Sequence, residues 1–177
     1  MNKNNLPEQE ERNNLKHSVL LSFGSNLGDK VQNIENALAL LAEQNSVQII
    51  TRSSFYETEP WGKSEQPKFI NSVALFKTSL SPNALLKLLK HIELMNGRQI
   101  RERWGEREID IDILLYDALI YNDTDLTIPH PEMHRRNFVL IPACEIAPNL
   151  HHPILNKSIK SLSENSDDKL KVNKISI

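Results

Sequence analysis

Hydrophobic positions recur with two different periods along the chain, and the order of these periods predicts the fold. Four segments carry strand-like patterns: residues 17–23, 47–56, 69–78 and 109–116. Two segments carry apolar residues at helical spacing: residues 31–41 and 82–95. The order strand, helix, strand, strand, helix, strand predicts an α+β fold, a ferredoxin-like sandwich with both helices packed on one face of an antiparallel sheet.

Capping and turn residues mark the ends of these elements. Either Asn26 or Asp29 is expected to supply the N-cap of the first helix. Ser81, which is followed by proline, is the expected N-cap of the second helix, and Asn96-Gly97 ends that helix. Residues 119–128 predict a short hairpin.

The chain is expected to form one globular domain over residues 17–155, because 177 residues with 39% hydrophobic content can bury a core without disulfides. Residues 1–16 are rich in Asn and Glu and lack an apolar stretch. This composition excludes a signal peptide or membrane anchor there and predicts a disordered extension. Residues 156–177 are also polar and predict a tail with at most one peripheral element.

Charge and cysteine content narrow the possible functions. The formal net charge is −2 and the sequence pI is about 6.3, so no overall basic field points to a nucleic acid or an anionic membrane. Cys144 is the single cysteine, which excludes an intrachain disulfide and a cysteine-rich zinc site. A reducing cytoplasm fits this cysteine usage.

A pair of carboxylates stands out on the last predicted strand. Ile109, Ile111 and Ile113 alternate with Asp110 and Asp112, so the two carboxylates share one face of the strand. Mg²⁺ prefers oxygen ligands, and two ions about 3.5–4 Å apart are typical of phosphoryl-transfer sites. A solvated strand face is the alternative explanation for an isolated Asp-x-Asp pair.

Four arginines precede these carboxylates, at positions 98, 101, 103 and 107. One guanidinium group can donate two parallel hydrogen bonds to the oxygens of a phosphate. Arginines beside two carboxylates that could bind a metal ion therefore indicate phosphoryl transfer. A salt-bridged hairpin is the alternative, because Glu102, Glu106 and Glu108 are interleaved with the arginines.

These residues by themselves predict a magnesium-dependent enzyme that uses a nucleotide. A kinase that transfers one phosphoryl group fits them as well as a pyrophosphokinase, and the product, ADP or AMP, distinguishes the two. A ferredoxin-like module that binds a metabolite or RNA without turnover is a rival of a different class. An RNA-binding sheet should carry exposed aromatics and a basic face, whereas here the arginine-rich segment leads into acidic residues.

The longer motif Arg103-Trp104-Gly105-x-Arg107-x-Ile109-Asp110-Ile111-Asp112 closely resembles the signature of the 6-hydroxymethyl-7,8-dihydropterin pyrophosphokinase (HPPK) family of folate biosynthesis. Other blocks match in family order between about Val19 and Pro153. They are residues 23–28, 54–62, 66–71, 92–98 and 128–138. The resemblance implies the same sandwich fold, with extra C-terminal elements at about residues 131–147.

The resemblance also implies an activity, the transfer of pyrophosphate from ATP to the hydroxymethyl group of 6-hydroxymethyl-7,8-dihydropterin. Asp110 and Asp112 would bind two Mg²⁺ ions, and Arg98 and Arg107 would act with them in catalysis. Arg98 and Arg103 match arginines in or beside a loop that closes over the site, and Trp104 matches the aromatic that seals it. The implied ATP-binding residues are Arg103, Trp104, Arg107, Ile113, Thr127, His130 and Arg136.

Phe69 and Phe138 match the aromatic residues that sandwich the flat pterin in the family, and Asn71 matches the residue that binds its amide edge. The full set of implied pterin-binding residues is Thr58, Pro60, Phe69, Asn71, Asp110 and Phe138. Glu93 lies on the helix face near Arg98, where it either orients arginines or is solvated. The loop between Gly97 and Trp104 is one residue shorter than the family pattern.

The resemblance further implies the partners of the chain. They are ATP and the pterin alcohol, with no nucleic acid and no membrane. A cytoplasmic monomer is expected, in contact with other enzymes of the folate pathway, to which family members are sometimes fused.

Overall fold

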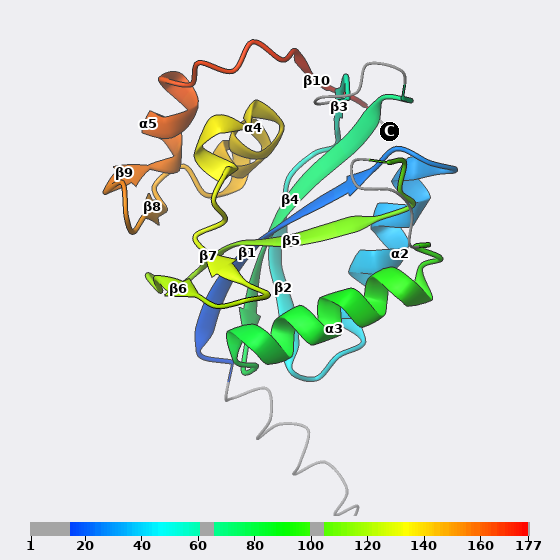
Figure 1. The fold of residues 1–177 in the computed structure, drawn as a ribbon, viewed down its shortest axis with the longest axis horizontal. Coiled ribbons are helices and arrows are strands. Elements are labelled where there is room, and N and C mark those ends of the chain that lie inside the picture. Colours follow the sequence, from blue (N-terminus) through cyan, green and yellow to red (C-terminus); the bar gives the residue numbers. More distant parts are fainter. Residues whose placement is uncertain (1–14, 61–65, 100–104, 177) are drawn as a thin grey trace, which may run out of the picture.

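The computed structural model describes residues 15–60, 66–99 and 105–176, and an antiparallel six-stranded sheet forms its centre (Figure 1). The sheet has the strand order β10-β3-β4-β1-β5, and β2 also pairs with β4. Its strands are β1 (His17–Ser25), β2 (Val47–Arg52), β3 (Tyr56–Thr58), β4 (Phe69–Thr78), β5 (Asp110–Tyr116) and β10 (Val172–Lys174). The predicted α+β sandwich with an antiparallel sheet is confirmed.

The central strands are buried on both faces, and alternate residues serve two different cores. On β1, Val19 and Leu21 belong to the core under the helices α2 (Lys30–Ala42) and α3 (Pro82–Met95). Leu20, which lies between them, packs into a second core with residues of α4 (Asn137–Ile146) and α5 (Ile159–Glu164). Because successive side chains of a strand point to opposite faces of the sheet, alternate residues of β1 pack against two different layers of helices.

The N-caps of α2 and α3 are side chains of residues that the sequence identifies. Asp29, one of the two candidates for α2, accepts a hydrogen bond from the Gln32 backbone N–H at 3.1 Å. Ser81 Oγ accepts one from the Ala84 N–H at 3.4 Å. Each cap satisfies a backbone donor that the first turn of a helix leaves unpaired.

The predicted strand over residues 47–56 is interrupted between β2 and β3. At the break, Ser53 donates its backbone N–H to the Val73 carbonyl at 2.9 Å, and its hydroxyl oxygen accepts from the Val73 N–H at 3.0 Å. Periodicity does not reveal such a break, because hydrophobic residues continue through it. The break lets β3 pair with the beginning of β4, where Thr58 lies opposite Phe69.

The residues after 156 form more structure than the single peripheral element that the sequence predicts. They contribute β9 (Lys157–Ser158), α5 and β10, and β10 joins the main sheet beside β3. The extra elements expected at residues 131–147 are η1 (Met133–Arg135) and α4. Polar composition hid β10 because an edge strand of three residues needs no hydrophobic run.

Small elements complete the described chain. The expected hairpin consists of β6 (Tyr121–Asn122) and β7 (Thr127–Ile128), and β8 (His151–His152) pairs with β9. No helix within residues 15–60, 66–99 and 105–176 has the length and apolar character needed to cross a membrane. The disorder expected for residues 1–16 lies, apart from Leu15 and Lys16, outside the described residues.

Candidate active site

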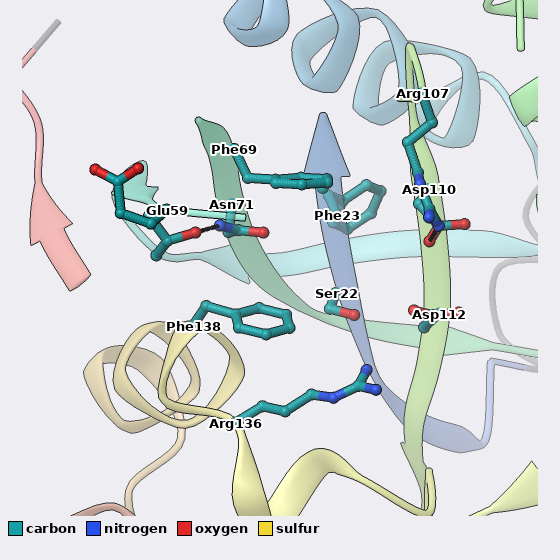
Figure 2. A pocket seen from close by; sticks show the side chains of 12 residues that line it. Ser22, Phe23, Glu59, Phe69, Asn71, Arg107, Asp110, Asp112, Arg136 and Phe138 are labelled. Carbon is teal, nitrogen blue, oxygen red and sulfur yellow. Dashed lines mark hydrogen bonds and ion pairs between the residues drawn. The ribbon is translucent and has the colours of Figure 1, made fainter. Parts of the chain in front are cut away.

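The two aspartates project from β5 into a cavity that residues of β1, β4 and α4 also line (Figure 2). Ile109 and Ile111 are fully buried in the core on the other side of the strand, whereas Asp110 and Asp112 are half-buried. The predicted alternation is confirmed. Because both carboxylates line a cavity, a plain solvated strand face does not describe them.

Two arginines bind the Asp110 carboxylate. Arg98 Nη1 donates to Asp110 Oδ1 at 2.7 Å, and Arg107 Nη1 donates to Oδ2 at 2.5 Å. Burial alone would lower the pKa of Arg98, but the carboxylates of Asp110 and Glu93 raise it above its usual value. Two of the arginines noted in the sequence therefore converge on the first aspartate of the pair.

Asn26 holds the backbone at Arg107. Its N–H donates to the Arg107 carbonyl at 3.1 Å, and its side-chain oxygen accepts from the Arg107 N–H at 2.8 Å. The Asn26 side-chain NH₂ also donates to Gln66 Oε1 at 3.1 Å. Asn26 is thus not the helix cap that the sequence allowed but a buried link between the end of β1 and the arginine segment.

The first cavity has the form of a slot between two aromatic rings. Phe69, from β4, lies on one side and Phe138, from α4, lies on the other (Figure 2). Asn71 lies between them, is 5% exposed, and donates its side-chain NH₂ to Thr58 Oγ1 at 2.9 Å. A flat heterocycle with polar edges would fit such a slot, stacked between the rings.

Gly24 gives the slot its width at the β1 side. A Cβ atom at this position would lie 3.3 Å from Asn71 Oδ1 and 3.9 Å from Phe69 Cδ1. Any other residue would therefore press on the amide and approach the ring. The glycine lies opposite Asn71 in the β1–β4 ladder, which is why the two residues meet.

Most of the residues implied in pterin binding line this cavity, together with Arg107, Asp112 and Arg136. Pro60 is described but is not among the lining residues. Sequence reasoning did not assign site roles to four further lining residues: Ser22, Phe23, Gly24 and Glu59. Phe23 and Gly24 lie in a block that resembles the family, so a signal for them was present. Glu59 likewise lies in the matching block at residues 54–62, whereas Ser22 lies outside all of the matching blocks.

A second cavity lies on the other side of Asp112. Ile113, Thr127 and His130 line it, and all three are among the implied ATP-binding residues. Asp112 lines both cavities. The remaining lining residues of the second cavity come from α3, β5 and the β6–β7 hairpin region: Leu86, Lys90, Ile111, Asp123, Thr124, Asp125, Leu126 and Pro131.

His130 is neutral near pH 7. Burial is the main cause that lowers its pKa to about 4, and the positive charge of Arg136 acts in the same direction. Its Nδ1 accepts a hydrogen bond from the Glu132 N–H at 3.2 Å, which assigns the ring proton to Nε2. His130 is therefore suited to donate a hydrogen bond to an anionic oxygen rather than to act as a cation.

The two aspartates suit a magnesium ion whose other ligands are waters and phosphate oxygens. Burial raises the pKa of Asp112 to about 6, and the nearby Asp110 carboxylate adds to the shift. In the described part of the chain, no three or more His, Cys, Asp or Glu residues form a group that could hold a metal ion. Mg²⁺ commonly binds to one or two carboxylates and completes its shell with phosphate oxygens and waters, so this donor set suits it.

Arg136 reaches the site from the start of α4. Its guanidinium carbon lies 5.7 Å from the centre of the Phe138 ring, a distance at which a cation and an aromatic face attract. Figure 2 shows its side chain extending toward Asp112. The implied lid residues Arg103 and Trp104, like Arg101, lie outside the described residues.

Comparisons with known proteins identify relatives over most of the chain. The family model described as 7,8-dihydro-6-hydroxymethylpterin-pyrophosphokinase (HPPK) matches residues 20–148. A 2-amino-4-hydroxy-6-hydroxymethyldihydropteridine pyrophosphokinase of Haemophilus influenzae is 40% identical over 156 residues, covering 86% of this chain and 98% of the relative. The enzyme of the same name from Aquifex aeolicus is 43% identical over 143 residues, covering 81% of this chain and 88% of the relative.

The fold is also found in a solved structure. A crystal structure of Plasmodium falciparum HPPK-DHPS is similar to this chain with a TM-score of 0.68 at 18% sequence identity. The similarity covers 84% of this chain and 45% of the solved chain, so this chain spans less than half of that protein.

Proposed function

This chain belongs to the 7,8-dihydro-6-hydroxymethylpterin-pyrophosphokinase family, and on that premise we propose which of its residues carry the reaction. The enzyme transfers pyrophosphate from ATP to the hydroxymethyl group of 6-hydroxymethyl-7,8-dihydropterin in folate biosynthesis. A bond forms between the hydroxymethyl oxygen and the β-phosphorus, and the bond from the β-phosphorus to the α-phosphate oxygen breaks. AMP leaves, and the hydroxyl proton passes to solvent.

One observation carries the assignment of the substrates to the two cavities. Asp112 lines both, so a molecule in either cavity has the same carboxylate at its boundary. The pterin occupies the slot between Phe69 and Phe138, where Asn71 and Thr58 meet its polar edge. ATP occupies the second cavity, with the nucleoside near Ile113 and Thr127 and the triphosphate directed toward Asp112.

Asp110 and Asp112 would hold two Mg²⁺ ions. When bound, these ions supply positive charge that stabilises the phosphate oxygens as the bond to AMP breaks. An ionised carboxylate has about four lone-pair positions, so Asp110 can accept from both arginines and still have capacity for a metal ion.

The chain's own cations and donors orient the triphosphate. Arg107 and Arg136 line the first cavity near the aspartates and offer guanidinium groups to the phosphate oxygens. His130 donates from Nε2, and Arg98 acts from a position just after the end of α3. Holding the reacting oxygens in line is the main contribution that a protein makes to this chemistry.

Replacing Asp112 with asparagine tests this proposal. We expect the wild-type enzyme, given Mg·ATP and 6-hydroxymethyl-7,8-dihydropterin, to produce AMP, and D112N to lower kcat by roughly 10²- to 10³-fold. AMP and ADP are measured separately by chromatography. ADP as the product would overturn pyrophosphoryl transfer.

Asp117→Asn is the matched control. Asp117 immediately follows β5, is exposed and pairs with His17 at 2.7 Å, away from both cavities. Its φ of 47° is a conformation that asparagine also tolerates. We expect D117N to keep its activity, and an equal loss in both variants would argue against a special role for Asp112.

The cytoplasmic location and the monomeric state stay predictions of the sequence. Contact with another folate-pathway enzyme is also proposed. The Plasmodium falciparum HPPK-DHPS chain supports it, because the part similar to this chain is joined there to a longer polypeptide.

A further inference from the structure

Glu93 on α3 is a buried carboxylate that contacts β5 between the two aspartates. Glu93 is 1% exposed, although it occupies the helix face whose other buried members, Leu85, Leu89 and Ile92, are hydrophobic. Removing a carboxylate from water costs free energy that a hydrophobic residue at the same position would not incur. Such a departure from the core pattern is typical of residues that serve the site rather than packing.

Glu93 bonds to the strand at the residue between the aspartates. Its Oε1 accepts a hydrogen bond from the Ile111 backbone N–H at 2.7 Å. β5 is at the edge of the sheet, with β1 as its neighbour, so it needs a partner other than a strand on its outer side. The carboxylate of Glu93 supplies that partner at Ile111. Because Ile111 lies between Asp110 and Asp112, its backbone orientation affects the directions in which both aspartate side chains project.

Glu93 also fixes Arg98 at two points. Its backbone carbonyl accepts from the Arg98 N–H at 3.0 Å, and its Oε2 pairs with Arg98 Nη1 at 2.5 Å. The same Nη1 donates to Asp110, so one guanidinium nitrogen bridges the two carboxylates. Lys90 donates to both oxygens of Glu93 at 3.1 Å and completes the set of donors.

We propose that Glu93 is a positioning residue, which holds the backbone between Asp110 and Asp112 and the guanidinium of Arg98 in the arrangement that metal and triphosphate require. The sequence left open whether Glu93 orients arginines or is solvated. In the structure Glu93 is buried and pairs with Arg98, so it is not solvated. The inference rests on the proposed function for its effect on turnover. Its effect on the Ile111 amide does not depend on any activity.

Two variants separate the functions of the carboxylate. E93Q keeps an oxygen that can accept from the Ile111 N–H but removes the charge that pairs with Arg98. E93A removes both. Loss of a group that orients a metal ligand commonly costs 10- to 100-fold in affinity or activity. We therefore expect E93A to lower kcat and to raise the Mg²⁺ concentration needed for half-maximal rate by about 10- to 100-fold, and E93Q to recover part of the loss.

Leu89→Ala is the control for destabilisation alone. Leu89 lies about one turn earlier on α3, is fully buried and is not among the residues that line either cavity. We expect L89A to lower the melting temperature and yet, below that temperature, to keep the wild-type kcat and Mg²⁺ requirement. A kcat that falls in step with the melting temperature across all three variants would overturn the proposal.

Amide hydrogen exchange gives a second readout on the protein without substrates. We expect faster exchange at Ile111 in E93A than in the wild type, with protection largely kept in E93Q and L89A. Unchanged protection of Ile111 in E93A would refute the backbone role. If the wild type produced no AMP, the proposed function would fail, but this exchange measurement would still decide whether Glu93 holds β5.

Discussion

At the scale of single residues, the slot between Phe69 and Phe138, which we propose binds the pterin, depends on which hydrogen-bonding groups of its lining residues can reach a ligand. Asn71 uses its NH₂ group on Thr58, so its carbonyl oxygen is the group that can accept from a ligand (Figure 2). Gly24 leaves room for that oxygen. The polar edge of the slot is thus set by one hydrogen bond and one missing side chain.

Replacing Asn71 with alanine should weaken pterin binding selectively. A buried hydrogen bond left without its partner costs about 1–3 kcal/mol, so we expect the KM for the pterin to rise roughly 10- to 100-fold. The KM for ATP should stay near the wild-type value, because Asn71 lines the first cavity but not the second. Steady-state kinetics with each substrate varied in turn measures both.

Thr58→Val provides the comparison for that experiment. It preserves the volume of the side chain but removes the oxygen that orients the Asn71 amide. We expect a smaller rise in the pterin KM than in N71A. A rise in the ATP KM as large as that in the pterin KM, in either variant, would contradict the assignment of the first cavity to the pterin.

At the scale of elements, Glu145 on α4 joins parts of the chain that are far apart in sequence. Its carboxylate accepts from the Ser54 N–H at 3.0 Å, from the Tyr56 hydroxyl at 2.8 Å and from Lys174 Nζ at 3.1 Å. These partners lie between β2 and β3, on β3 and on β10. β10 is therefore held beside β3, whose last residue, Thr58, lines the slot between Phe69 and Phe138.

The pKa of Glu145 predicts how this link depends on pH. Burial alone would raise the pKa, but hydrogen bonds from Ser54, Tyr56 and Lys174 lower it from 4.5 to about 2. A pKa that is lower in the folded state stabilises the protein above the unfolded value, and this contribution is lost as the pH falls from 4.5 to about 2. Because the side chain is 29% exposed, we expect a contribution of about 1–2 kcal/mol at pH 7.

Comparison of wild type with Glu145→Gln isolates that contribution. At pH 7 the variant should unfold at a lower denaturant concentration than the wild type, and the difference should shrink as the pH is lowered through 4.5 toward 2. Chemical denaturation followed by circular dichroism measures it. A difference that stays constant between pH 7 and pH 2 would show that ionised Glu145 does not stabilise these elements.

At the scale of the whole molecule, helices pack on both faces of the sheet, and each of the two helix layers contributes residues to the site (Figure 1). α3 contributes Glu93 and lines the second cavity, whereas α4 contributes Phe138 to the first. β5 runs between them and carries both aspartates. Ligands that bind there should therefore stabilise the folded protein as a unit.

Removal of the metal should abolish most of the stabilisation by nucleotide. At a concentration near 100 times Kd, Mg²⁺ with a non-hydrolysable ATP analogue should add about 2.7 kcal/mol, or roughly 5–11 °C in Tm. With EDTA present, the triphosphate faces the two aspartates without a cation between them, so we expect a much smaller shift. An equal shift with and without EDTA, read by thermal denaturation, would argue against metal-assisted nucleotide binding.

The sequence by itself determined the main elements, because each of them follows from spacing and capping that act locally. Alternation at residues 109–113 placed the two aspartates on one face of a strand, and Ser81 and Asn96-Gly97 marked the ends of α3. That Asp110 and Asp112, the proposed metal ligands, lie together was predictable for the same reason, since a side chain at i and one at i+2 of a strand share a face.

Only the tertiary structure decided how distant residues combine. Asn26 with Arg107, Glu93 with Ile111, and Glu145 with Lys174 are separated by 81, 18 and 29 positions, and no local period relates the members of each pair. Their contacts depend on how sheet and helices pack, which is a property of the whole chain. The same holds for β10, whose three residues become a strand because β3 offers them an edge.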